Sequence, residues 1–455
     1  MIKQFLNRTN ELQTLNSRYN SKKAEFTVIY GRRRIGKSRL IDEFIDDKRG
    51  VRLLAREESE KMTLERFSKN LAELFEDETL AQTTLPDWDN FFEYITRKTE
   101  EERFVIAIDE FPYIVEQKRS FPSILQDHWD RSLENTQIFL IICGSAVSAM
   151  EDIMGHESPL YGRRTSQLLI KPISFKNIYR EINIDIEKAI KFYSVFGGTP
   201  PYFMEVDLNE TLEHNLVHNV FQYDSFLLQD TEFVLRSELK KPHLYFSILT
   251  AVAEGKTRVN EIVNHTGVER SKVGRYLSIL RDLKLVEREV PVTEENTKSR
   301  RGIYKLKDNF FKFWFNFINP NQMLLERSKS QELADKVMES LPNYIGPLFE
   351  DICRELVWDD HDYQEMGRWW YKENEIDIVG LNPDEKKILF GECKWSEDVD
   401  PRSLYHKLKE KKDEVRWNEQ NRKEEFVLFA KSFQNDFSKE DLTLVNLEKM
   451  ERSMK

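Results

Sequence analysis

Short apolar runs alternate with longer amphipathic stretches along the first part of the chain. Runs of strand length lie at residues 24–30, 51–55, 104–110, 138–145 and 166–173. Between them apolar residues repeat at helical spacing, as in the stretch that begins at Thr63. Strands that alternate with helices are typical of a mostly parallel sheet covered on both faces. We therefore expect an α/β domain over residues 1–180.

The pattern then changes to helices alone. Residues 181–245 show helical spacing without strands. Residues 246–310 hold three helical patterns, with the turn HTGV between the last two and a polar hairpin-like stretch after them. This order is typical of a winged helix. The aromatic segment 310–317 is far shorter than the roughly 18 apolar residues of a membrane span, and we expect it to pack between domains.

The last third of the chain mixes strands and helices again. Connecting helices are expected over residues 311–345, and a second α/β module over 346–455. In that module WWYKENEIDIVGL and KKILFGECKW predict two paired strands. A helix and two further strands follow them. The overall expectation is a multidomain α/β protein.

Composition narrows the range of partners. The chain has 455 residues, a formal net charge of −11 and a pI of about 5.5. A generic polyanion binder is thereby excluded, so any contact with DNA requires a local basic patch. The three cysteines are far apart, the start of the chain is too polar for a secretory signal, and no apolar run is long enough to span a membrane. We expect a cytoplasmic protein without membrane contact.

One stretch predicts nucleotide binding. The sequence GRRRIGKS places Gly31, Gly36, Lys37 and Ser38 at the spacing of a phosphate-binding loop, between a strand and a helix. The glycines let backbone N–H groups turn toward phosphate oxygens. Lys37 would reach the β and γ phosphates, and the Ser38 hydroxyl would bind magnesium. ATP and Mg²⁺ are therefore the expected ligands.

Two later strand ends supply the remaining groups of such a site. The run FVIAIDE predicts Asp109 as the magnesium ligand and Glu110 as the residue that orients and deprotonates water. Ser145 ends another strand, where it would contact either the γ-phosphate or the water. The alternative for Ser145 is a helix cap.

Arginines surround this motif. Arg163 and Arg164 in SPLYGRRT could supply a cation against charge that develops on the γ-phosphate, in cis or from a neighbouring molecule. The alternative is an ordinary surface salt bridge. Residues 32–34 are three arginines in the variable positions of the loop, and we expect them to project outward, to solvent or to a partner.

The predicted winged helix carries a local excess of positive charge. Residues 255–308 hold 13 Lys or Arg and 8 Asp or Glu, in a chain that is acidic overall. In the third helix the apolar positions face the core, which leaves Arg270, Lys272, Arg275 and Arg281 toward solvent. This favours contact with DNA. The alternative is a domain that packs on the nucleotide-binding domain instead.

The last module holds residues that could bind a metal. EIDIVG supplies Asp377, and GECKW supplies Glu392 and Lys394 on one face of the next strand. Glu350 could approach from a helix, and Glu375 shares the face of Asp377. Carboxylates that hold a divalent metal beside a lysine are the groups that phosphodiester cleavage needs. The alternative is a salt-bridged pair of strands.

Several ordered motifs resemble those of a known family. The chain resembles the prokaryotic archaeal ATPases, which are AAA+-related, signalling-type P-loop NTPases with a C-terminal domain similar to PD-(D/E)xK nucleases. The matching segments run along nearly the whole chain: FLNRTNEL, YGRRRIGKSRL, IDEF, CGSAVSAM, SPLYGRRT, GGTPPYF, YKLKDNFFKFWF, EIDIVG and GECKW. The resemblance implies a parallel sheet in the order 5-1-4-3-2, a helical lid, a winged helix and a nuclease-like module.

The resemblance also implies particular residue roles. It places Arg8 near the nucleotide and Pro200, in GGTPPYF, on the adenine side, although GGTPP alone would also suit a turn. The nucleotide-binding set is completed by loop and helix residues: Arg34, Ile35 and Arg39. Asp377, Glu392 and Lys394 match the D…ExK motif of the family.

Three functions remain open at this point. The first is an ATP-hydrolysing switch coupled to a metal-dependent nuclease-like effector that acts on DNA. The second is a DNA-binding regulator that does not cleave and whose domain arrangement is set by ATP. The third is an ATPase whose C-terminal module docks a protein. Cleavage, the choice between DNA and RNA, and self-association are not fixed by the sequence.

Overall fold

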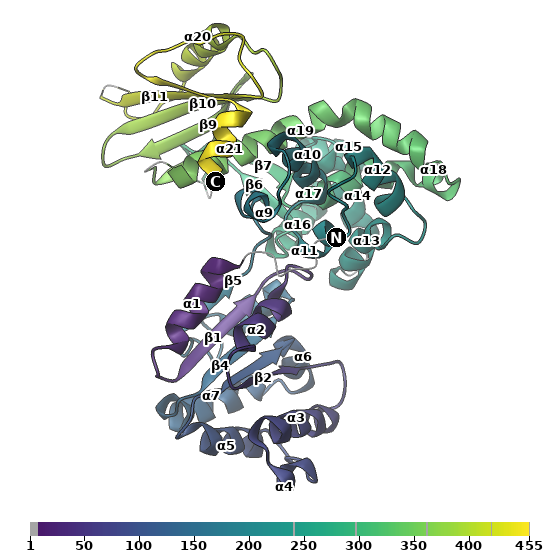
Figure 1. Ribbon diagram of the computed structural model, residues 1–455, viewed down its shortest axis with the longest axis vertical. Coiled ribbons are helices and arrows are strands. Elements are labelled where there is room, and N and C mark those ends of the chain that lie inside the picture. The colour runs from purple at the N-terminus through teal and green to yellow at the C-terminus, as the bar shows by residue number, and fades with distance from the viewer. Residues whose placement is uncertain (1–7, 240–241, 296–297, 361–362, 420, 455) are drawn as a thin grey trace.

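The structure is a computed structural model that describes residues 8–239, 242–295, 298–360, 363–419 and 421–454. The first three residues of the FLNRTNEL segment therefore lie outside the described part. Figure 1 shows an elongated molecule with an α/β domain at one end, a helical region in the middle and a second sheet at the other end. No helix in the described ranges is long and apolar enough to cross a membrane.

The N-terminal domain is built on a parallel five-stranded sheet. Its strand order is β2-β3-β4-β1-β5, which confirms the predicted order read from the opposite edge. The strands are β1 (Glu25–Tyr30), β2 (Gly50–Leu54), β3 (Val105–Asp109), β4 (Phe139–Gly144) and β5 (Ser166–Leu169). The helices are α1 (Thr9–Tyr19), α2 (Lys37–Ile45), α3 (Glu60–Phe75), α4 (Glu78–Ala81), α5 (Trp88–Thr99), α6 (Phe111–Gln117), α7 (Phe121–Arg131) and α8 (Val147–Met154).

Both faces of this sheet are covered because its strands are apolar on both sides. Strands β1 and β4 are buried at every position. Helices α1 and α2 pack on one face, through Leu15, Leu40 and Phe44. Helices α3, α5 and α7 pack on the other. The parallel arrangement brings the carboxyl ends of all strands to one edge, where the phosphate-binding loop, Asp109, Glu110 and Ser145 are found.

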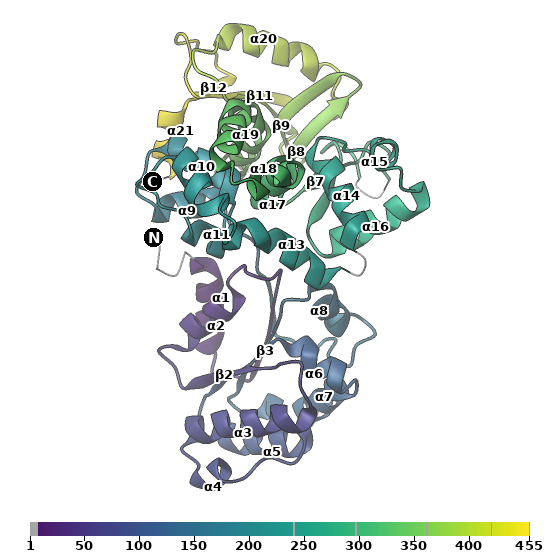
Figure 2. The same ribbon diagram turned by 90° about the vertical axis from the view of Figure 1, so that its right-hand side faces the viewer.

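A helical region follows the first sheet. It comprises α9 (Phe175–Glu181), α10 (Ile186–Phe196), α11 (Pro200–Met204), α12 (Leu212–Asn215), the π-helix η2 (Leu216–Val220) and α13 (Phe226–Glu238). The winged helix comes next, as predicted, with α14 (Pro242–Ala253), α15 (Val259–Thr266), α16 (Arg270–Asp282) and the antiparallel strands β6 (Val286–Glu289) and β7 (Ile303–Leu306). Figure 2 shows the winged helix beside the junction of the helical region and the first sheet.

The aromatic segment after the winged helix is buried. It forms α17 (Asn309–Phe313) and the π-helix η3 (Trp314–Ile318), followed by α18 (Gln322–Glu326). Phe310, Phe313 and Trp314 lie in one core that extends from α9 to the C-terminal helix. The predicted packing between domains is confirmed, and this core joins the helical region, the winged helix and the last module.

The C-terminal module is a mixed sheet between two helices. The long helix α19 (Ser330–Asp360) covers one face and α20 (Pro401–Lys412) the other (Figure 2). The strand order is β12-β11-β10-β9-β8. The strands are β8 (Glu365–Tyr371), β9 (Asn374–Asn382), β10 (Lys387–Lys394), β11 (Lys423–Ala430) and β12 (Leu442–Val445), and α21 (Leu447–Met454) follows.

The segment WWYKENEIDIVGL, predicted as one strand of this module, instead forms parts of two strands joined by a turn. WWYKENEIDIVGL contains the end of β8, a turn and β9, which pair antiparallel. The turn places Lys372 at φ 53°. A lysine at positive φ is unusual, and neither Gly nor Pro marks this turn in the sequence. The predicted pairing of the Asp377 strand with the Glu392 strand is confirmed, as β9 with β10.

Candidate functional site

The phosphate-binding loop lies between β1 and α2, as its sequence predicts. Gly31 and Gly36 have φ of 150° and 89°, which glycine adopts without steric cost. A Cβ on Gly31 would lie 2.4 Å from the carbonyl oxygen of Ile170, so the loop also requires glycine for space. The backbone geometry of the motif is therefore formed by these two residues.

Lys37 begins α2 and is buried under the loop. Its Nζ donates to the carbonyl oxygens of Gly31 and Arg32, each at 2.8 Å. The loop borders a cavity of about 500 Å³. Every residue predicted to bind the nucleotide except Gly31 lines this cavity: Arg8, Arg34, Ile35, Gly36, Lys37, Ser38, Arg39, Ser145 and Pro200. Glu110, which is predicted to act on water, lines it as well.

The predicted pair of carboxylates, Asp109 and Glu110, lies beside the phosphate-binding loop. Ser38 Oγ donates to Asp109 Oδ2 at 2.8 Å, which joins the loop to the end of β3. Asp109 Oδ1 accepts the N–H of Glu110 at 3.0 Å. Asp109 is only 1% exposed, whereas Glu110 lines the cavity. Glu110 has φ 55°, a conformation that a non-glycine residue rarely adopts.

Ser145 contacts Glu110 directly. Its Oγ donates to Glu110 Oε2 at 2.9 Å, and its backbone N–H points to the same oxygen at 3.4 Å. The N-cap of the following helix α8 is Ala146, so the helix-cap alternative for Ser145 is wrong. The structure thus places a hydroxyl against the side chain that we predict to act on water.

Arg8, which precedes the loop in the sequence, and Pro200, which follows it, both lie beside the loop. Arg8 is buried, and its Nη2 donates to the carbonyl oxygen of Ile35 at 2.7 Å. Burial lowers the pKa of Arg8 from its ordinary value, while the nearby Glu11 opposes that shift. Pro200 begins α11, and its Cγ would lie 3.9 Å from a Cβ on Gly36. Both residues border the cavity, as the family resemblance implies.

Two arginines of the loop do not project outward, contrary to the prediction. Arg32 Nη2 donates to Asp308 Oδ2 at 2.7 Å, and Arg34 forms an ion pair with Asp230 at 2.6 Å. Both carboxylates are buried, at 2% and 1% side-chain exposure. A buried carboxylate requires a paired cation, which explains why these arginines turn inward. We call these two pairs the arginine clamp.

The arginine clamp ties the loop to the helical region. Asp230 lies on α13 and also accepts the hydroxyl of Tyr202 at 2.8 Å. Asp308 caps α17 directly after the winged helix and also accepts from Thr199 Oγ1 at 3.0 Å. Tyr202 and Thr199 belong to the GGTPPYF segment, so this segment supports the clamp in addition to bordering the cavity.

Arg163 does not lie at the cavity. Its Nε and Nη2 donate to Asp130 at 3.0 and 2.8 Å. It lines a separate polar pocket with Ala24 and Thr136, which precede β1 and β4. In a parallel sheet that edge is opposite to the phosphate loop. The predicted role of Arg163 within its own chain is therefore wrong in this arrangement, and a role toward a neighbouring molecule remains a prediction.

The winged helix exposes the predicted basic face. Val273, Leu277 and Leu280 are buried, whereas the basic residues of α16 are exposed: Arg270, Lys272, Arg275 and Arg281. The domain also contacts the N-terminal domain, because Lys284 forms an ion pair with Glu151 of α8 at 3.1 Å. Leu283 and Leu285 share a small cavity with Ser145. The two alternatives for this domain, DNA contact and packing, are thus compatible.

The connection between β6 and β7, the wing, packs against edge strand β8. Val292 N donates to the carbonyl oxygen of Arg368 at 2.9 Å. Arg301 Nη1 donates to the carbonyl oxygen of Trp370 at 2.7 Å, and Trp370 Nε1 donates back to Arg301 at 3.2 Å. An edge strand presents unpaired backbone groups, and here the wing donates to two of them, the carbonyl oxygens of Arg368 and Trp370. The wing therefore joins the winged helix to the C-terminal sheet.

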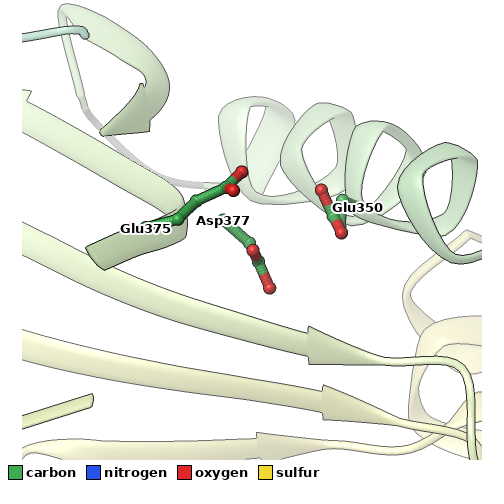
Figure 3. Close-up of side chains that lie close together, drawn as sticks. All are labelled: Glu350, Glu375 and Asp377. Carbon is green, nitrogen blue, oxygen red and sulfur yellow. The ribbon is translucent and has the colours of Figure 1, made fainter. Parts of the chain in front are cut away.

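Three carboxylates converge beside this contact. Glu350 of α19 and Glu375 and Asp377 of β9 each offer one oxygen, and these oxygens lie within 4.8 Å of one another. Figure 3 shows Glu350 directed from the helix toward the two side chains on the strand. Burial and then Asp377 raise the pKa of Glu350 to about 7. The predicted approach of Glu350 from a helix is observed.

Glu392 is held differently from its prediction. It lies outside that group of three, and its carboxylate accepts from Lys394 Nζ at 3.0 Å and from Lys411 Nζ at 2.8 Å. Burial, and then the charge of Glu392, raise the pKa of Asp377 above its ordinary value. Asp377 Oδ2 accepts the N–H of Cys393 at 2.9 Å. The structure thus adds Glu375 to the acidic group and gives Glu392 two lysine partners.

A cation already lies among the acids. Arg368 of β8 contacts Glu375, and its Nη2 lies 3.7 Å from Glu350 Oε2. A further approach to Glu289 of the winged helix, at 3.8 Å, extends the network across the domains. Oxygen-only ligands suit Mg²⁺ or Mn²⁺, but a metal there would compete with this guanidinium.

Sequence reasoning missed several charged partners of the site. They are Arg52, Asp230, Asp308, Arg368 and Lys411. A charged residue within an apolar strand run, as in VRLLA for Arg52 and GRWWY for Arg368, was the available signal. Such a residue must find a buried partner, although the sequence does not reveal which one.

These features define the class of the N-terminal domain. A glycine-rich loop leads from β1 of a parallel sheet into a helix, and an acidic residue ends β3, which is separated from β1 by β4. This arrangement is that of a P-loop nucleoside-triphosphatase domain. A family model described as an ATPase domain predominantly from Archaea matches residues 5–206. The chain belongs to this archaeal ATPase family, since it is 33% identical over 415 residues to the uncharacterized protein MJECL04 of Methanocaldococcus jannaschii.

The match to that relative covers 89% of this chain and 91% of the relative. The uncharacterized ATP-binding protein MJ0423 of the same organism is 44% identical over 48 residues, which is 10% of this chain and 81% of that protein. Residues 247–288 match a model described as a bacterial regulatory protein of the arsR family. Residues 314–424 match archaeal and bacterial proteins of unknown function.

Among solved structures, one that the chain matches is the Walker-type ATPase PABY2304 of Pyrococcus abyssi. It is 19% identical, with a TM-score of 0.49, and the alignment covers 69% of this chain and 96% of that one.

Proposed function

We propose that this protein is an ATP-driven switch. Its N-terminal domain binds ATP with Mg²⁺ and hydrolyses it, and the nucleotide state sets the arrangement of the winged helix and the C-terminal module. The observation that carries the proposal is the set of contacts at the mouth of the loop. Ser38 bonds to Asp109, and Ser145 bonds to Glu110, on the border of one cavity of about 500 Å³.

The groups at this mouth fit a magnesium ion. The Ser38 hydroxyl and the Asp109 carboxylate are hard oxygen donors that already lie 2.8 Å apart, as ligands of one small cation would. A magnesium ion bound there supplies positive charge against the phosphate oxygens. Lys37 would add a fixed cation from the protein once its amino group turns from the loop carbonyls to the phosphates.

Glu110 would orient the attacking water. Its carboxylate borders the cavity, and Ser145 fixes the orientation of one oxygen. The other oxygen, Oε1, is then available to accept a proton from water at the γ-phosphate. General-base catalysis of this kind contributes roughly 10² to 10⁴ to a rate.

The arginine clamp would carry the nucleotide state to the rest of the chain. Arg32 and Arg34 lie in the loop that holds the phosphates, and their partners Asp308 and Asp230 lie on α17 and α13. A shift of the loop by even a fraction of an ångström would strain two buried ion pairs at once. Because buried pairs tolerate little separation, the helices would move with the loop.

A second proposal concerns the C-terminal module. The convergence of Glu350, Glu375 and Asp377 within 4.8 Å favours a divalent metal site, which is the chemistry of a nuclease-like effector. The pairing of Arg368 with Glu375 and Glu350 instead favours a module that does not cleave, because the guanidinium already neutralises these carboxylates. A module that only docks a protein would need neither metal nor DNA.

One experiment separates these functions. Purified protein is incubated with ATP, Mg²⁺ and a panel of DNA and RNA, and phosphate release, cleavage and mobility shifts are followed together. The proposal expects Mg²⁺-dependent phosphate release. Cleavage identifies the effector function, a shift without cleavage identifies the regulator, and neither result points to protein docking. Absence of phosphate release with every nucleic acid would contradict the switch.

A further inference from the structure

Arg52 lies beside the candidate magnesium ligand and has no role in the proposal above. It is on β2, which pairs with β3 so that Arg52 lies opposite Ala107 and Leu54 lies opposite Asp109. From this position the guanidinium extends along the sheet to its carboxyl edge. Nη1 donates to Asp109 Oδ2 at 3.1 Å.

The same guanidinium is held from the other side by Asp42 of α2. Nε donates to Asp42 Oδ1 at 2.6 Å and Nη2 to Asp42 Oδ2 at 3.1 Å, which is a forked arrangement. The side chains of Arg52 and Asp42 are 27% and 43% exposed, whereas that of Asp109 is 2% exposed. Arg52 thus connects a buried carboxylate to one near the surface.

Asp109 Oδ2 is shared between two donors. Ser38 Oγ donates to it at 2.8 Å, and Arg52 donates from 3.1 Å. The other oxygen accepts the Glu110 N–H, so the carboxylate is fixed in orientation on both sides. The hydrogen bonds to Asp42, and then the charges of Asp42 and Asp109, raise the pKa of Arg52, which keeps the guanidinium charged.

We propose that Arg52 is a positioning residue that directs Asp109 toward Ser38 and, as a fixed cation beside the shared oxygen, limits how tightly the site retains Mg²⁺. This inference rests on the proposed MgATP function. Asp42 weakens the influence of Arg52 on metal binding. It accepts two of the three hydrogen bonds of the guanidinium and so holds the guanidinium away from a closer contact with Asp109.

Two opposite changes in metal affinity follow from this geometry. Arg52→Gln removes the competing charge, so the metal should bind more tightly while Asp109 loses its orientation. Asp42→Asn weakens the outer attachment, so Arg52 should move closer to Asp109 and the metal should bind more weakly. Arg52→Lys keeps the positive charge but cannot form the two parallel hydrogen bonds to Asp42. Metal affinity in this variant should therefore stay near that of the unsubstituted protein.

The test measures binding of Mn²⁺ in the presence of a non-hydrolysable ATP analogue by electron paramagnetic resonance. It uses the full chain with Asp377→Ala in every variant, so that the acidic group of the C-terminal module does not contribute to the Mn²⁺ signal. We expect Arg52→Gln to lower the Mn²⁺ dissociation constant roughly three- to tenfold and Asp42→Asn to raise it about twofold or more. Steady-state kcat at saturating Mg²⁺ should fall in both Arg52 variants. Arg49→Gln is the matched control, since Arg49 precedes the same strand at its far end and pairs with Glu102.

Each outcome decides the inference. A role in folding alone would change the midpoint of thermal unfolding without moving the two metal affinities in opposite directions, and that result would overturn the inference. Equal Mn²⁺ affinity in all variants would overturn it while leaving the switch intact. If the unsubstituted protein bound no Mn²⁺ with the analogue, the inference and the switch would both fail. Should Arg52→Gln not fold, Asp42→Asn and Arg52→Lys still give the decisive comparison.

Discussion

Arg32 of the phosphate loop donates to Asp308 across 2.7 Å and thereby joins the nucleotide cavity to the residue that follows the winged helix. Asp308 also accepts the N–H of Phe311 at 3.0 Å. The same carboxylate therefore binds Arg32 of the loop and caps the N-terminus of α17. Phe311 in turn lies under the guanidinium, whose carbon is 4.9 Å from the ring centre. The loop is therefore in direct contact with the helical core through Arg32, Asp308 and Phe311.

The free energy of interaction between Arg32 and Asp308 should exceed that of a surface ion pair. A double-mutant cycle with Arg32→Gln and Asp308→Asn is expected to give a coupling free energy of roughly 1–3 kcal/mol. The same cycle on Arg131 and Asp127, an exposed pair one helical turn apart, should give about 0.3–0.5 kcal/mol. Urea denaturation measures both. Equal coupling in the two cycles would contradict a buried clamp.

DNA binding, where it occurs, should depend on α16. Reversal of Arg270, Lys272 and Arg275 to Glu is expected to weaken binding and to lower the salt slope by about one for each lost phosphate contact. Titrations by fluorescence anisotropy at several salt concentrations measure the slope. A matched reversal on α3 and α5 serves as control and covers three exposed residues: Lys61, Lys69 and Arg97. Unchanged affinity in the α16 variant would leave packing on the N-terminal domain as the role of the winged helix.

Metal binding at the C-terminal module should be limited by Arg368. In the Lys37→Ala background, which removes nucleotide-dependent binding, Arg368→Gln is expected to tighten Mn²⁺ binding because it leaves the three carboxylates without their guanidinium partner. Asp377→Ala should abolish that binding. Calorimetric titration measures both, and Asp377→Ala alone should not change ATP hydrolysis. No difference between Arg368→Gln and its background would contradict a metal site among these acids.

The free energy of unfolding should depend on pH because burial raises the pKa of Glu350. Burial raises the pKa of Glu350 in the folded protein to about 7. At any pH between the lower pKa of the unfolded chain and 7, Glu350 therefore releases a proton when the protein unfolds. Stability attributable to this group is therefore lost as pH rises through that interval. In the presence of a chelator, the melting temperature of Glu350→Gln should exceed that of the unsubstituted protein at pH 7.5 by more than at pH 5. A difference that is constant with pH would contradict the raised pKa.

The strands and motifs of this chain could be predicted because they depend on local pattern. Five apolar runs became the five strands of the first sheet, and GRRRIGKS formed the loop with glycines at positive φ. The helix-turn-helix was equally visible, since apolar spacing on α16 leaves its basic residues outward. These features need only periodicity and turn chemistry.

The partners of charged residues could not be predicted in the same way. Arg32 and Asp308 are separated by 276 positions, and nothing local in either segment identifies the other. Arg163 was misplaced because its sequence distance from the loop does not show which edge of the sheet it occupies. Glu375 was noted only as an extra acid, and its grouping with Glu350 depends on how α19 crosses the sheet.

The most direct measurement of the central claim concerns Glu110. Glu110→Gln keeps the size of the side chain and its hydrogen bond with Ser145, but removes the basic carboxylate that would act on water. We predict that this variant binds a fluorescent ATP analogue as the unsubstituted protein does, whereas Lys37→Ala does not bind it. Phosphate release by Glu110→Gln should fall by roughly 10² or more. Hydrolysis at the unsubstituted rate would contradict the assignment of Glu110 and, with it, the proposed site of ATP hydrolysis.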